Sequence, residues 1–146
     1  MIIRICASSL IVAGLLTVSD LAVAQQPYPD LKGTWIGPGQ GLIQGKTEHG
    51  TNNAGDTEPV FRENSWILIV DRQEGNRFVG SHGLTNGTRR DPILAVIRED
   101  RRTIHMVDDD GTFTTILTGP DTLEMCRTEV TAVSRIVGCR QLTRQK

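Results

Sequence analysis

Short runs of Ile, Val, Leu, Thr and aromatic residues alternate with clusters of turn-forming residues along most of the chain. From Phe61 onward these clusters lie roughly 10 to 13 residues apart, a spacing typical of all-β sandwiches and barrels. β-Branched and aromatic residues favour a pleated, half-buried surface, so each run predicts a strand. The eight expected strands are Gly33–Leu42, Trp66–Val70, Arg77–Ser81, Ile93–Ile97, Thr103–Val107, Phe113–Thr118, Leu123–Val130 and Arg135–Leu142.

The gaps between these strands are too short to hold a crossover helix, so neighbouring strands must run antiparallel. Eight strands joined by successive hairpins most simply close into an up-and-down barrel, which leaves no exposed sheet edge. We therefore expect an all-β fold, an eight-stranded antiparallel up-and-down β-barrel.

A polar, glycine-rich segment, Lys46–Pro59, follows the first expected strand. Loops of this length in small domains are often binding loops or lids. A simple surface connection between two strands is the other interpretation, and the sequence does not choose between them. No Gly-Lys-Ser/Thr follows the glycines, so a phosphate-binding loop is not expected.

The N-terminal residues 1–24 have the pattern of a signal peptide. The uncharged run Ile5–Val18 is shorter than the ~20 residues that span a bilayer as a helix. Ala22-Val23-Ala24 matches the small-x-small pattern of a signal peptidase site. We expect cleavage after Ala24, an N-terminal extension at residues 25–30 and a barrel domain at residues 31–146, located in the periplasm or secreted. The alternative is an N-terminal membrane anchor, against which the short apolar run and Asp20 both argue; after cleavage no membrane attachment is expected.

Removal of residues 1–24 leaves two cysteines, Cys126 and Cys139. An even number of cysteines in an exported chain is the expected signature of a disulfide. A four-residue loop at Thr131–Ser134 would pair Val130 with Arg135 and place the two cysteines directly opposite each other. A metal site is not expected, because paired histidines do not accompany the cysteines.

The same hairpin register sorts residues between two faces, because alternate residues of a strand point to opposite sides of the sheet. The more apolar face is assigned to the barrel interior, which places the disulfide outside. The inward set is Leu123, Met125, Arg127, Glu129, Ile136, Arg140 and Leu142.

Charge and composition exclude several classes of protein. Sixteen Lys and Arg against seventeen Asp and Glu give a formal net charge of −1, so nucleic acid is not an expected partner. The content of 38% hydrophobic and 23% charged residues excludes collagen-like, coiled-coil and disordered chains.

The stretch Leu31-Lys32-Gly33-Thr34-Trp35 resembles the opening strand of the calycin superfamily, the lipocalins and avidins. Trp66–Val70, a turn at Glu74-Gly75, and Phe78–His82 are together similar to an early hairpin of avidins. The resemblance implies an avidin-like or lipocalin-like barrel whose Gly-x-Trp motif is structural, with Trp35 closing one end.

In calycins a late arginine commonly stacks on the Gly-x-Trp ring, and the resemblance gives this role to Arg140, with Arg144 as second choice. It does not imply tight biotin binding. Avidins line the biotin pocket with several Trp and a Tyr, whereas Trp35 and Trp66 are the only tryptophans here and Tyr28, the sole tyrosine, precedes the barrel.

No arrangement of residues in the sequence indicates catalysis or metal binding. His105 is expected to point outward, because Ile104 and Met106 align with the inward apolar set. Ser81 and His82 are adjacent and therefore point to opposite faces of a strand. The run Asp108–Gly111 is better explained as a hairpin turn than as a calcium loop. We therefore expect no enzyme activity, no cofactor and no metal.

The function expected from these observations is non-enzymatic binding of a small, apolar or partly polar molecule in the mouth of the barrel. The candidate ligand-binding residues are Trp66, Phe78, His82 and Arg140, with Lys46–Pro59 as a covering loop. The alternative is a periplasmic protein-binding inhibitor of a protease or lysozyme, which would use exposed loops and keep the barrel filled with side chains.

Overall fold

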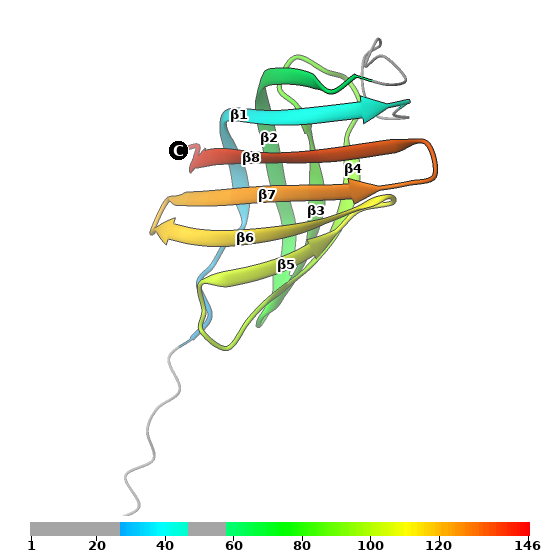
Figure 1. The fold of residues 1–146 in the computed structure, drawn as a ribbon. Helices are drawn as coiled ribbons and strands as arrows, with labels where there is room; N and C mark the ends of the chain where they lie inside the picture. Colours follow the sequence, from blue (N-terminus) through cyan, green and yellow to red (C-terminus); the bar gives the residue numbers. More distant parts are fainter. Residues whose placement is uncertain (1–26, 47–57) are drawn as a thin grey trace, which may run out of the picture.

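Eight antiparallel strands pair in the order of the sequence, and the last strand pairs with the first to close a barrel. The structure, a computed structural model, describes residues 27–46 and 58–146. In Figure 1, β8 lies between β7 and β1, and β2, β3 and β4 form the wall behind them. The strands are β1 (Gly33–Gly45), β2 (Val60–Glu74), β3 (Arg77–Leu84), β4 (Asp91–Ile97), β5 (Thr103–Val107), β6 (Gly111–Gly119), β7 (Thr122–Val130) and β8 (Ser134–Arg144).

This architecture confirms the expected all-β fold, an eight-stranded antiparallel up-and-down barrel. Within the described ranges, no helix is long and apolar enough to cross a membrane. The expected signal peptide and most of the Lys46–Pro59 loop lie outside the described residues.

β2 differs most from its expected range, because it begins at Val60 rather than at Trp66. After Val60 and Phe61 its first part is polar, and most of it is exposed, so the sequence pattern gives little strand signal there. The backbone of this part pairs with β1, from Val60 opposite Ile43 to Ser65 opposite Pro38. Hydrogen bonding along β1, rather than burial of side chains, therefore lengthens the strand.

Alternate residues of the strands pack into one half of the barrel around Trp35, which is fully buried at the expected closed end. Its indole Nε1 donates a hydrogen bond of 2.9 Å to the carbonyl of Leu31. Gly33 has a φ of 115°, which side chains disfavour, so the Gly-x-Trp motif requires glycine there. The other buried apolar residues are Leu31, Leu68, Val70, Phe78, Ile93, Ile97, Ile104, Met106, Phe113, Leu123, Met125 and Leu142.

Arg144, and not Arg140, covers the Trp35 ring, which corrects the first choice made from the resemblance. The Arg144 guanidinium carbon lies 4.3 Å from the ring centroid, and its Nη atoms donate to the carbonyls of Lys32 and Asp30, each at 2.7 Å. The β1–β8 register explains the difference, because it places Trp35 opposite Arg144. Both arginines share one face of β8, so alternation alone does not distinguish them.

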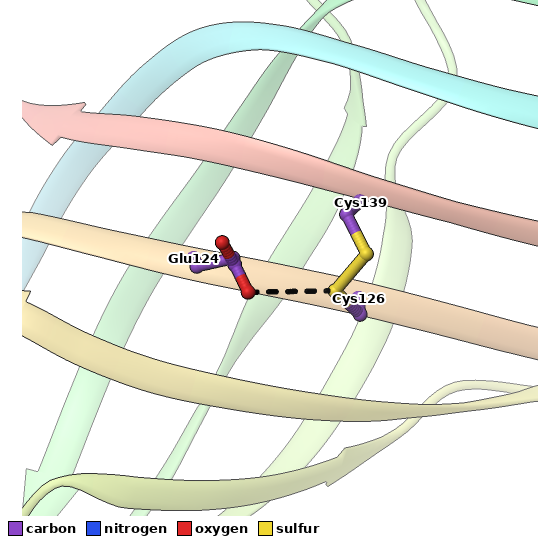
Figure 2. Close-up of a disulfide and its surroundings, with 3 residues drawn as sticks. All are labelled: Glu124, Cys126 and Cys139. Atoms are coloured by element: carbon purple, nitrogen blue, oxygen red, sulfur yellow. Dashed lines mark hydrogen bonds between the residues drawn. A yellow bond between two sulfur atoms is a disulfide. The ribbon is translucent and has the colours of Figure 1, made fainter.

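The disulfide and the faces of the C-terminal hairpin are as expected. Cys126 lies opposite Cys139 in the β7–β8 ladder, with a Cα–Cα distance of 4.0 Å, and the two are bonded. Figure 2 shows the bridge spanning the two strands, with the Glu124 side chain beside it. The residues assigned inward are buried or half-buried, and the disulfide lies on the outer face.

Replacing both cysteines, Cys126→Ala with Cys139→Ala, should lower the free energy of unfolding by about 3 kcal/mol, because the bridge closes a short loop in the unfolded chain. Urea denaturation followed by circular dichroism measures the change. Wild-type protein treated with a reductant serves as the control and should show the same loss. An unchanged midpoint in both samples would contradict the prediction.

Candidate functional site

The barrel interior changes from apolar around Trp35 to charged toward the β5–β6 and β7–β8 turns. His82, Arg127, Glu129 and Arg140 are each at most 5% exposed there, and the Asp108 side chain is 2% exposed. We call these five residues the polar end of the barrel. Burying a charge costs free energy unless the charge is paired, so the partners of each residue show how its burial is stabilised.

Arg127 is the best-paired member of the polar end. Its Nη2 lies 3.1 Å from Asp108 Oδ2 and also contacts Asp110, and its Nη1 lies 2.5 Å from Glu129 Oε2. Glu129 in turn accepts a hydrogen bond of 2.6 Å from the Ser134 hydroxyl. Three carboxylates therefore satisfy this one guanidinium, and Arg127 joins the β5–β6 turn to the β7–β8 hairpin.

Asp108 owes its orientation to the tight turn that begins with it. Its Oδ1 accepts a hydrogen bond of 2.6 Å from the backbone N–H of Gly111, while Oδ2 points inward to His82 and Arg127. Burial alone would raise the pKa of Asp108, but the hydrogen bond from His82 and the charge of Arg127 hold it well below the usual range. The carboxylate is therefore ionised.

His82 presents one ring nitrogen to Asp108 and leaves the other without a partner. Its Nε2 lies 2.9 Å from Asp108 Oδ2, and its Nδ1 is buried and unpaired. Burial, together with the charges of Arg140 and Arg127, lowers the pKa of His82 although Asp108 raises it, so the ring is neutral at pH 7. Because the carboxylate accepts from Nε2–H, Nδ1 carries a free lone pair.

Arg140 is a buried cation that stacks on aromatic rings and, among the described residues, pairs with no carboxylate. Its guanidinium carbon lies 3.4 Å from the Trp66 ring centroid and 5.7 Å from that of Phe113. Its Nη1 is buried without a hydrogen-bond partner. Burial and the charge of Arg127 lower its pKa to about 9, which leaves it cationic at neutral pH.

Gly39 makes room for this stack. β1 places it directly opposite Arg140 on β8, and a Cβ at this position would lie 2.6 Å from Arg140 Cγ and 2.9 Å from Trp66 Cδ1. Any larger residue would therefore push the arginine or the indole out of place.

Three of the four residues expected to bind a ligand lie together at the polar end. The Trp66 and His82 rings are stacked with centroids 6.4 Å apart, and Arg140 lies on Trp66. Phe78 is instead part of the apolar core, four residues before His82 on β3 and opposite Ala95 on β4. A strand runs from one end of the barrel to the other, so two inward residues of the same strand can lie far apart. Phe78 therefore does not lie near Trp66, His82 and Arg140 although it is on the same face of β3 as His82. A covering role of Lys46–Pro59 stays a prediction.

Sequence reasoning missed Asp108 and Phe113, and gave Arg127 an inward position without a role. The register of the β6–β7 hairpin could have indicated these contacts. It pairs Phe113 with Arg127 and brings Arg127 beside the turn that begins at Asp108. His105 is exposed, as expected. Among the residues that the structure describes, no group of three or more His, Cys, Asp or Glu is placed to hold a metal ion.

A groove with a mainly apolar lining and a volume of about 270 Å³ lies between β1, β7 and β8, beside the polar end, with which it shares Glu129. Phe61, close to this groove, is 82% exposed. Leu42 on β1 pairs with Phe61 on β2 and with Val137 on β8. We call this groove the outer groove; its lining residues are Leu42, Ile43, Gln44, Pro59, Thr128, Glu129, Val130, Arg135, Ile136 and Val137.

No protein-family model and no curated protein matches the chain. Among solved structures, it is similar to that of the S-type phycobiliprotein lyase CPES from Guillardia theta, with 10% sequence identity and a TM-score of 0.35. The match covers 80% of this chain and 89% of that chain. Because that protein is named a lyase, the expectation that this chain is not an enzyme is contradicted, and we withdraw it.

His82 should make folding stability decrease as the pH falls below the unfolded pKa of about 6.5. Its pKa in the folded protein lies below the unfolded value of 6.5, so acidification protonates the unfolded chain first. Stability should therefore be fully present above that value and decrease as the pH falls. Urea denaturation should show a weaker dependence in His82→Gln, whereas the exposed control His105→Gln should keep the wild-type profile. Identical profiles in all three proteins would contradict this assignment.

Proposed function

We propose that the chain is an exported barrel that binds a small molecule at its polar end, in contact with Trp66, His82 and Arg140. The observation that carries the proposal is the buried guanidinium of Arg140, which stacks on Trp66 and has an unpaired Nη1. Ligand sites typically combine aromatic walls with a few convergent polar groups. At the polar end, Arg140 and His82 provide the polar groups, and Trp66 beside them provides an aromatic wall.

The unpaired atoms of Arg140 and His82 favour a ligand over a purely structural role. A buried donor or acceptor without a partner costs about 1–3 kcal/mol, and more when the group is charged. Buried polar groups in native proteins are almost always satisfied, so each exception requires an explanation. A bound molecule with complementary groups would recover this free energy, whereas the neighbouring Arg127 already has its partners.

The neutral fluorescent probe N-phenyl-1-naphthylamine tests whether the polar end binds a small aromatic molecule. Its fluorescence should rise on binding, and Trp66→Ala should weaken the affinity roughly tenfold, because the indole provides much of the apolar contact. Phe61→Ser, which removes the exposed aromatic residue near the outer groove, is the matched control and should leave the affinity unchanged. Loss of binding in Phe61→Ser alone would assign the probe to the outer groove instead.

Export is supported by the disulfide, since such bonds persist in oxidising compartments. We propose that the mature protein is periplasmic or secreted. Intact mass spectrometry of the processed protein should show a chain that lacks residues 1–24 and is two hydrogens lighter than the reduced form. A full-length mass, or two free thiols, would contradict this proposal.

A second candidate function is the binding of a partner protein, as an inhibitor would. The observation that favours it is the cluster of exposed apolar side chains near the outer groove, where Phe61, Val130 and Val137 are at least half exposed. Large exposed apolar patches often mark interaction surfaces. This function would be preferred if no aromatic probe binds at the polar end.

A further inference from the structure

The unpaired groups of the polar end define the chemistry of the molecule that fits them. Resting on the proposed function, we infer that the ligand is a flat, aromatic or conjugated anion. Its carboxylate or similar acidic group pairs with Arg140, and an N–H or O–H group donates to Nδ1 of His82.

The negative charge follows from the electrostatic surroundings of Arg140. Among the described residues, no carboxylate contacts Arg140, whose guanidinium stacks on Trp66 and has a buried Nη1 without a partner. The nearby acidic groups are engaged elsewhere: Asp108 with His82 and Arg127, and Glu129 with Arg127 and Ser134. An acidic group on the ligand is therefore the partner that Arg140 lacks. Guanidinium groups bind carboxylates through two parallel hydrogen bonds.

The donor on the ligand follows from the tautomer of His82. Asp108 accepts from Nε2–H, which fixes the proton on that nitrogen and leaves Nδ1 able only to accept. A ligand with an amine, amide, pyrrole or hydroxyl group beside its acidic group satisfies both sites. A simple fatty acid has no such donor and satisfies Arg140 alone.

The flat shape follows from the rings that surround the two polar groups. His82 lies nearly parallel to Trp66, with 23° between the ring planes, and edge-on to Phe113 at a centroid distance of 4.9 Å. Conjugated rings gain stacking contacts on such surfaces that a flexible aliphatic chain does not. Trp66 is only partly buried, so its ring is the part of this cluster that a ligand can reach from outside.

Two fluorescent probes with the same ring system separate the charge from the aromatic contact. 8-Anilino-1-naphthalenesulfonate and N-phenyl-1-naphthylamine both contain an anilino N–H, but only the first carries an anionic group. The wild-type protein should bind the sulfonate at least tenfold more tightly than the neutral probe. Arg140→Gln should reduce this preference to about twofold or less, because a charge-assisted hydrogen bond contributes about 1.5–3 kcal/mol.

The matched control is Arg135→Gln, which removes another arginine of β8. Arg135 is exposed and lines the outer groove, where it donates to Gln44. The preference for the anion should survive in this variant. If Arg135→Gln and not Arg140→Gln removes it, the anion binds at the outer groove and the inference is wrong.

A measurement on the wild-type protein guards against failure of Arg140→Gln to fold. 1-Naphthoate should displace the sulfonate probe at least tenfold more effectively than the uncharged 1-naphthamide. Equal binding of both probes and equal displacement by both competitors would overturn the anionic ligand and leave the proposed function intact. No binding of either probe would overturn the proposed function itself.

Discussion

The register between β1 and β8 determines what happens at both ends of the barrel. One and the same ladder places Trp35 opposite Arg144 and Gly39 opposite Arg140. At the closed end the result is an indole covered by a guanidinium. At the polar end a glycine leaves the space in which a second guanidinium stacks on Trp66. A slip by one residue would turn every inward side chain of one strand outward, so the apolar core around Trp35 also fixes the geometry of the candidate site.

Arg127 and Arg140 show how the same residue type serves two purposes in one interior. Both side chains are about equally buried, yet within the part of the chain that the structure describes Arg127 contacts three carboxylates and Arg140 contacts none. Pairing offsets the desolvation of Arg127, and the resulting ion pairs hold the β5–β6 turn against β7. A cation–π contact with a desolvated cation contributes about 2 kcal/mol, so it offsets only part of the cost of burying the Arg140 charge. The difference in partners, rather than in burial, separates the structural arginine from the one proposed to bind a ligand.

Alternation along strands made much of this fold accessible from the sequence. The eight strands, the Cys126–Cys139 bridge and the inward face of the last hairpin all follow from a two-residue period and a four-residue loop. The period assigns a residue to a face but not to a height in the barrel. It therefore did not separate Arg140 from Arg144, and it grouped Phe78 with His82 although the two lie at different ends. The contact between His82 and Asp108 joins β3 to the turn between β5 and β6, strands that do not pair with β3, and the local pattern contains no signal for it.

Asp108 connects the structural and the proposed functional halves of the polar end. One carboxylate oxygen closes the β5–β6 turn through the N–H of Gly111, and the other holds both Arg127 and the Nε2 of His82. The turn thus fixes the carboxylate, the carboxylate fixes the tautomer of the histidine, and the tautomer leaves Nδ1 as an acceptor. The site is therefore prepared before any ligand arrives, and binding does not have to order these side chains. Preorganisation of this kind lowers the entropic cost of binding, which is the physical reason to place a ligand's polar groups against a rigid ion-paired cluster instead of a loop.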